Sequence, residues 1–221
     1  MTIVDIIVRY RQAFMAGLEV TFELAIIAWI IGLVGGAIIG IAAHTWSIAV
    51  GWPLRVLAFL LSGIPFLVIL YWMNYPFQTL LNIVVKPFVT ASCVLSAINV
   101  VLVAEIWRGA LDDFRDEYRM AARACGMTRA ESIRYIEFPM LFRQVMPTLL
   151  IVQIVILQTT LFASLISVNE IFRVAQQIDS SIHKPVEIFS ALAVFFTALC
   201  VPAFAIAMWF RQRFTRNLSE R

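Results

Sequence analysis

The chain has 221 residues, of which 62% are hydrophobic and 14% are charged, with a formal net charge of +3. Soluble domains are about 45–50% apolar, so this composition excludes an ordinary soluble domain and predicts an all-α polytopic membrane protein. The small net charge matters less than the placement of the basic residues, and no nucleic-acid partner is expected.

Five apolar runs are long enough to cross a bilayer, which takes about 20 residues of α-helix. The first run is longer than a bilayer is thick, so it is expected to tilt or to project. Together the runs predict about five transmembrane helices in a single transmembrane domain that covers residues 1–221. The runs lie at residues 13–43, 53–73, 87–107, 146–168 and 186–210.

The first run contains a stripe of small residues. Gly32, Gly36 and Gly40 recur every four residues and therefore share one helix face. Such a stripe lets a second helix approach closely. The alternative is a flexible helix with incidental glycines, and in either case the stripe concerns packing and not chemistry.

The basic residues predict how the helices are oriented. The side that carries the 44–55 loop, the 108–143 insert and the 211–221 tail holds 12 Lys and Arg residues, whereas the other side holds 5. Basic residues concentrate on the cytoplasmic side of membrane proteins. We therefore expect the insert and the C-terminus in the cytoplasm and the N-terminus outside.

The polar insert at residues 108–143 is predicted to form two short helices. The first covers residues 116–125, and Gly126 suits the position just after a helix C-terminus. Thr128 and Glu131 have the spacing of a capping box, which starts the second helix. Pro139 is expected to break or bend that helix.

The composition of the insert favours a protein partner. Its six acidic residues nearly balance its seven arginines, and this mixture suits a protein surface better than a lipid or nucleic-acid surface. Ala121, Ala122 and Ala124 leave the first helix thin enough to enter a groove. The alternative is a solvated helical loop without a partner.

Polar side chains within the apolar runs are costly in a membrane and mark candidate functional positions. One polar face lies on the third run and another on the fourth, and Glu19 and Glu23 lie one turn apart in the first. The two faces consist of Ser92, Ser96 and Asn99, and of Gln153, Thr160, Ser164 and Ser167 with Gln158 and Thr159 beside them. The alternative for these residues is interhelical hydrogen bonding. The candidates that we select for a solute path are Asn99, Gln153, Gln158 and Thr160.

The remaining polar residues predict no site of their own. Glu105 is expected to pair with Arg108, three residues later, and His44 and His183 lie alone in predicted connections. The three cysteines lack metal or disulfide spacing, and the phosphate-binding motif G-x-x-x-x-G-K-[ST] is absent. We therefore expect no catalytic residue, no metal and no cofactor in this chain.

The start of the insert resembles a known motif. The E-A-A loop of binding-protein-dependent ABC importer permeases is similar to Ala104-Glu105-Ile106-Trp107-Arg108-Gly109-Ala110, then Met120-Ala121-Ala122, Gly126, Ile136 and Pro139. Within that superfamily the chain most resembles the polar amino acid permeases, which serve histidine, glutamine, arginine and opines. Further matching positions are Gly17-Leu18, Thr21, Pro65, Leu161 and Glu170.

The resemblance implies a type I importer permease fold in the bacterial cytoplasmic (inner) membrane, surrounded by membrane lipid. It implies that separate ATP-binding cassette ATPase subunits grip the insert and hydrolyse ATP, so this chain is not expected to be an enzyme. It also implies a second permease subunit and an extracytoplasmic solute-binding protein that delivers a polar solute, an amino acid or a derivative. The residues implied in ATPase coupling are Met120, Ala121, Ala122, Gly126, Glu131 and Pro139.

The chain departs from the family pattern at several positions. Met120 replaces the first Glu of E-A-A, and Ser62 stands where an R-G-T-P element has its arginine. Pro139-Met140-Leu141 replaces P-Q-A, and Gln158-Thr159-Thr160-Leu161 stands where the family often has K-D-T-S-L. These changes leave the fold expectation intact but do not allow a substrate to be transferred. The second permease is a copy of this chain or a relative, and the missing features favour a heterodimer.

Two other functions stay open from the sequence. A self-sufficient carrier or channel would transport without ATP, although such carriers usually enclose their site between paired repeats and this sequence shows none. A membrane assembly factor would use the insert as an adaptor and transport nothing. Neighbouring genes for an ATPase and a secreted binding protein would favour the importer.

Overall fold

The structure, a computed structural model, describes residues 3–215. All regular elements in this range are helical, which confirms the all-α expectation. The longer helices are α2 (Arg11–Thr45), α3 (Trp52–Gly63), α6 (Pro87–Asp112), α9 (Phe138–Thr159), α10 (Ile171–Ile182) and α11 (Pro185–Thr215). The shorter elements are α1 (Ile3–Arg9), η1 (Ser47–Gly51), α4 (Phe66–Asn74), α5 (Pro76–Leu81), α7 (Asp116–Ala124), α8 (Arg129–Ser132), η2 (Ile133–Glu137) and η3 (Thr160–Ile166).

Four helical stretches in the described range are long and apolar enough to span a membrane, and a bent pair of helices supplies a fifth. This confirms the expectation of about five transmembrane helices. Arg216 and Arg221, which contribute to the predicted charge asymmetry, lie outside the described residues. The four stretches are Arg11–Thr45, Pro87–Asp112, Arg129–Ile166 and Pro185–Arg213.

The second predicted run, at residues 53–73, is not one straight helix. The stretches Ser47–Gly63 and Phe66–Leu81 are bent by 98° relative to each other. Ile64 is extended, with φ −105° and ψ 123°, because the ring of Pro65 disfavours a helical residue before it and Pro65 has no N–H to donate. Hydropathy does not reveal the break because the residues on both sides of it are apolar.

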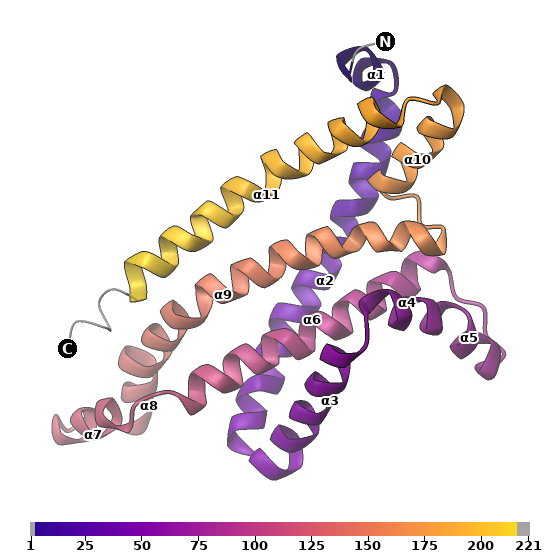
Figure 1. The fold of residues 1–221 in the computed structure, drawn as a ribbon. Helices are drawn as coiled ribbons and strands as arrows, with labels where there is room; N and C mark the ends of the chain where they lie inside the picture. Colours follow the sequence, from indigo (N-terminus) through magenta and orange to yellow (C-terminus); the bar gives the residue numbers. More distant parts are fainter. Residues whose placement is uncertain (1–2, 216–221) are drawn as a thin grey trace.

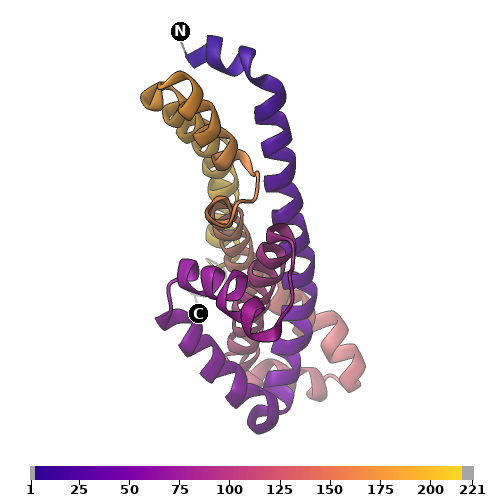
Figure 2. The same cartoon turned by 90° about the vertical axis from the view of Figure 1, so that its right-hand side faces the viewer.

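The spanning helices cross the molecule at a slant, and short elements gather at its two ends (Figure 1). α1 and α10 lie at one end, whereas α7, α8 and the turn between α2 and α3 lie at the other. α4 and α5 run across the side of the bundle (Figure 2), as the 98° bend requires. The insert and the α2–α3 turn therefore share one end, as the predicted topology requires.

The main apolar core lies where α2, α4, α6 and α9 meet. Leu24, Ala28, Leu70 and Leu95 are almost completely buried there. α2 packs along α6, and both helices contact α9. This core fixes the long helices α6 and α9, which carry the candidate path residues Asn99, Gln153 and Gln158.

The glycine stripe forms the contact between α2 and α6, which confirms its predicted packing role. A Cβ atom on Gly36 would lie 2.5 Å from Cβ of Val103 and 2.9 Å from the Val100 carbonyl oxygen. A Cβ atom on Gly40 would lie 2.5 Å from the Ala104 carbonyl oxygen. Side chains at these positions would push the two helix backbones apart.

We predict that Gly36→Ala destabilises the protein. Alanine is the better helix former, by about 1 kcal/mol, so a loss of stability would report the steric clash, for which overpacking typically costs about 1–3 kcal/mol. The measurement is the thermal denaturation midpoint in detergent. Gly109→Ala is the control, because no atom lies within 4 Å of its Cβ position. A midpoint raised by Gly36→Ala as much as by Gly109→Ala would contradict the close helix contact.

Candidate functional site

The turn between α7 and α8 has the geometry that its sequence predicts. α7 ends at Ala124, and Gly126 adopts a left-handed φ of 77°. The Gly126 N–H donates to the Arg123 carbonyl at 3.0 Å, and the Met127 N–H donates to the Ala122 carbonyl at 3.1 Å. These bonds satisfy carbonyls that the helix end would otherwise leave unpaired. No neighbouring atom lies within 4 Å of a Cβ at Gly126. A side chain would therefore fit at this position, and it is the left-handed backbone conformation that favours glycine there.

The predicted capping box at the start of α8 is confirmed. The Thr128 N–H donates to the Glu131 carboxylate at 2.8 Å, and the Glu131 N–H donates to the Thr128 hydroxyl at 3.3 Å. The Thr128 hydroxyl also donates to Glu131 at 2.7 Å. Together with the glycine turn, these bonds fix the direction in which the chain leaves α7.

Of the two expected effects of Pro139, a break or a bend, the break does not occur. The chain is one helical stretch from Arg129 to Ile166. The element directly before the proline, η2, is a π-helix. Its wider turn accommodates the proline ring, which in a regular α-helix would meet the carbonyl four residues earlier. The insert is therefore joined directly to the spanning helix α9.

Arg119 holds α7 against the start of that continuous stretch. Its Nε donates to Glu137 at 3.1 Å, its Nη1 donates to Asp116 at 2.9 Å, and its guanidinium lies 5.2 Å from the centre of the Phe114 ring. The Ser132 hydroxyl donates to Glu137 at 3.0 Å. The insert is thus a preformed unit, held by contacts between its own elements.

The insert residues implied in coupling do not all face the same way. Met120 is 59% exposed, and Ala121, Gly126 and Glu131 are also exposed. Ala122, by contrast, is only 2% exposed. The outer face of α7 is therefore narrow and accessible, whereas Ala122 packs toward the interior of the insert.

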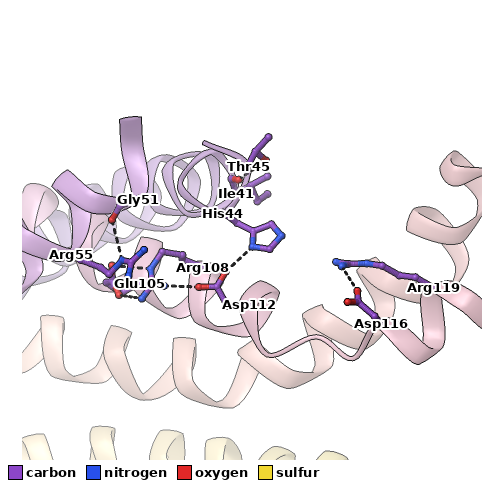
Figure 3. A network of polar contacts seen from close by, with 10 residues as sticks. All are labelled: Ile41, His44, Thr45, Gly51, Arg55, Glu105, Arg108, Asp112, Asp116 and Arg119. Atoms are coloured by element: carbon purple, nitrogen blue, oxygen red, sulfur yellow. Dashed lines mark hydrogen bonds and ion pairs between the residues drawn. The ribbon is translucent and has the colours of Figure 1, made fainter. Parts of the chain in front are cut away.

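Polar contacts join the end of α2 to the base of the insert (Figure 3). Arg108 donates to Glu105 at 2.6 Å, which confirms the predicted pair, and to Asp112 at 2.6 Å. Nδ1 of His44 lies 2.7 Å from Oδ1 of Asp112. The expectation that His44 is isolated is therefore wrong. His44 and Asp112 are 68 residues apart in the chain, so no local spacing indicates their contact.

Asn99 joins three spanning helices. Its side-chain Nδ2 donates to the Ala28 carbonyl and to Oε1 of Gln153, both at 2.9 Å, and Nε2 of Gln153 donates back to Oδ1 of Asn99 at 3.3 Å. Nε1 of Trp29 donates to the Gln153 backbone carbonyl at 3.0 Å. Both amide side chains are buried. The contact depends on Gly32, where a Cβ atom would collide with Asn99.

The other two candidate path residues lie apart from this pair. Thr160, the first residue of η3, is fully buried, and its hydroxyl donates to the Leu157 carbonyl of the preceding α9 at 2.7 Å. Gln158 is exposed on the surface of α9. The structure brings Asn99 and Gln153 together but leaves Gln158 and Thr160 separate from them. The assignment of all four residues to a solute path stays a prediction.

Glu170, between η3 and α10, has a structural role that the sequence analysis did not identify. Its carboxylate is fully buried and accepts hydrogen bonds from the N–H groups of Phe172 at 2.9 Å and Arg173 at 2.7 Å. Burial raises the pKa of Glu170 to about 7, and these two bonds only partly oppose the increase. The Ile171 N–H donates to the Thr21 hydroxyl at 3.1 Å, so the start of α10 is fixed against α2.

We predict that Glu170 makes the folded chain less stable as the pH rises toward 7 and above. Its pKa is higher in the folded chain than its ordinary value of 4.5. The stability that it contributes is therefore fully present below pH 4.5 and is lost as the pH rises through about 7. Glu170→Gln removes this titration and should lessen the fall in thermal midpoint across that range. The exposed Glu19→Gln is the control. Identical pH profiles for Glu170→Gln and wild type would contradict the prediction.

Among residues 3–215, no group of three or more His, Cys, Asp or Glu side chains could hold a metal ion. The geometry is that of a helical membrane protein with one preformed polar insert at one end. The insert is coupled to α6 and α9 by direct chain continuity and to α2 by the His44–Asp112 contact.

Comparison with known proteins gives a consistent result. Residues 32–216 match the family described as "Binding-protein-dependent transport system inner membrane component". The chain is 30% identical to the glutamine transport system permease protein GlnP of Escherichia coli (strain K12) over 172 residues, or 76% of this chain and 78% of that protein. It is 30% identical to the octopine transport system permease protein OccM of Rhizobium meliloti over 211 residues, or 89% and 85%. A crystal structure of an amino acid ABC transporter with histidines has the same fold, with a TM-score of 0.82 at 24% identity over 94% of this chain and 96% of that chain.

Proposed function

The chain belongs to the family of inner membrane components of binding-protein-dependent transport systems, and we propose that it forms half of the path of an ABC importer for a polar amino acid or amino acid derivative. The glutamine and octopine permeases to which it is similar support this solute class. The observation that carries the proposal is the preformed insert, which presents the narrow outer face of α7 and continues directly into α9.

The outer face of α7 is proposed as the docking surface for an ATP-binding cassette ATPase subunit. Met120 and Ala121 are exposed there, and small side chains let the helix enter a groove. Gly126 and the Thr128–Glu131 capping box set the angle between α7 and α8. Ala122 supports this surface from behind, and Pro139 lies where the insert joins α9. ATP would be hydrolysed on the ATPase and not on this chain.

The proposed orientation places the insert in the cytoplasm and the N-terminus outside. It is supported by the distribution of basic residues and by the shared end of the insert and the α2–α3 turn. An introduced Glu131→Cys should be protected from an impermeant thiol reagent in intact cells and labelled after lysis, in a chain whose native cysteines are replaced. Labelling in intact cells would reverse the topology.

The break between α3 and α4 is proposed to border the solute path. Ser62, Gly63, Ile64 and Pro65 are all exposed there, and a helix break at membrane depth is stable only where protein or a water-filled path, and not lipid, surrounds it. A second permease subunit that encloses the path together with this chain would cover them. We propose a relative of this chain as that subunit, because Ser62 replaces the arginine of the family pattern. An extracytoplasmic binding protein would deliver the solute at the α1 and α10 end.

The decisive experiment is reconstitution. The chain, its neighbouring ATPase and a second permease are purified together, placed in liposomes and supplied with the binding protein and a panel of polar amino acids. The proposal expects ATP-dependent uptake and solute-stimulated ATP hydrolysis. Uptake without ATP would indicate a self-sufficient carrier, and the absence of uptake with every amino acid and opine tested would favour an assembly factor.

We predict that Gly126→Val loosens the ATPase. A left-handed conformation costs a residue with a side chain roughly 1–2 kcal/mol. β-Branched residues such as valine tolerate this conformation least well. α8 should therefore leave α7 at a different angle, and less ATPase should co-purify with the inserted chain. Gly126→Asn, which tolerates this conformation better, and Gly109→Ala are the controls. Full retention of ATPase and transport by Gly126→Val would rule the idea out.

We predict that Gln153 and Gln158 both contribute to the solute path and not only to packing. Gln158→Leu changes an exposed residue and should lower uptake or alter solute preference without loss of assembly. Gln153→Leu removes the partner of Asn99, so it tests the path and the packing roles together. If both variants show wild-type uptake, Gln153 and Gln158 serve packing only and not the solute path. Loss of assembly with Gln153→Leu alone would assign that residue to the helix contact only.

A further inference from the structure

A cavity of about 500 Å³ lies between the end of α2 and the insert. His44 and Thr45 line it from α2, whereas Arg119 and Arg123 line it from α7 and Arg129 lines it from α8. In Figure 3 the side chains of His44 and Arg119 reach toward each other from its two sides. The exposed residues Met120 and Ala121, which we propose for ATPase docking, do not line it.

The cavity carries unbalanced positive charge. Its two acidic residues, Asp116 and Glu137, are both already paired with Arg119. Within the described part of the chain, Arg123 and Arg129 have no acidic side chain within ion-pair distance. Arg123 and Arg129 therefore give the cavity two guanidinium groups that no carboxylate among the described residues neutralises. Guanidinium groups bind phosphate and carboxylate oxygens through paired hydrogen bonds.

The same cavity also has an apolar side. Ile41 on α2 and Phe138 on α9 line it and are 48% and 54% exposed. Both belong to membrane-spanning helices. Trp46, just after α2, is 62% exposed, and exposed tryptophans are typical of the membrane–water interface. The cavity therefore runs from the apolar surface of the spanning helices to the arginines of the insert.

We propose that this cavity binds the phosphate headgroup of an anionic phospholipid. Arg123 and Arg129 would bind the phosphate, and Ile41 and Phe138 would contact the first part of the acyl chains. Basic pockets between spanning helices on the cytoplasmic side suit such headgroups. A lipid bound there would fasten the insert to the bilayer at the point where it joins α9. This inference does not depend on which solute is transported.

The experiment measures lipid retention by the complete complex. The chain is purified with its partner subunits, exposed to equal amounts of phosphatidylglycerol and phosphatidylethanolamine, and examined by native mass spectrometry. The test variant is Arg123→Gln with Arg129→Gln. The control is Arg115→Gln with Arg134→Gln, which also removes two exposed arginines but leaves the cavity lining unchanged. Arg123→Lys with Arg129→Lys retains the charge and serves as a second variant if the first folds poorly.

The wild type and the control should retain phosphatidylglycerol selectively. The variant Arg123→Gln with Arg129→Gln should retain at least about tenfold less of it. The lysine variant should keep most of the selectivity, with unchanged ATPase in all complexes. Equal retention of the two lipids, or equal retention by the two glutamine variants, would overturn the proposal. Displacement of phosphatidylglycerol by excess inorganic phosphate would assign the site to a free anion. Loss of the ATPase from the test variant alone, with lipid retained, would assign the arginines to the ATPase surface.

Discussion

The structure depends on the hydrogen bonds of one amide. Asn99 on α6 donates to the Ala28 carbonyl of α2 and exchanges hydrogen bonds with Gln153 of α9. In the membrane interior no water replaces a lost partner, so each group must find its bond within the protein. This contact requires glycine at position 32, because a side chain on Gly32 would occupy the space of Asn99. The packing of α2 on α6 and the polar tie to α9 are therefore one constraint.

In the insert, local contacts determine the internal shape, and contacts between distant parts of the chain determine its position. Its internal shape comes from short-range bonds, with a glycine turn and a capping box close together in the sequence. Its position relative to the spanning helices comes from contacts between elements far apart in the chain, such as His44 with Asp112. A partner that grips α7 would act on a unit with little internal freedom, so a displacement there must pass to α6 and α9.

The same division explains what the sequence could predict. The four unbroken spanning helices, the glycine stripe, Gly126 and the Thr128–Glu131 box were predictable because each depends on residue spacing within one helix or turn. The 98° break in the second span was not, because the residues on both sides of it are apolar. The effect of Pro139 was not, because the π-turn that accommodates it is a response of the folded backbone. The pairing of Asn99 with Gln153 was not predictable either. Sequence periodicity finds polar faces on separate helices, but it does not say whether two faces meet each other or a solute.

The tie at Gln153 divides the continuous helical stretch Arg129–Ile166 into two arms of unequal length. Within its α-helical part, Phe138–Thr159, a rise of 1.5 Å per residue makes the arm toward the insert about 22 Å long and the arm toward α10 about 9 Å. A rigid lever with its fulcrum at this contact would convert a swing at the insert end of α9 into an opposite movement of less than half the amplitude at its other end. Pro147 lies within the longer arm, where a bend would absorb part of that swing before it reaches the fulcrum.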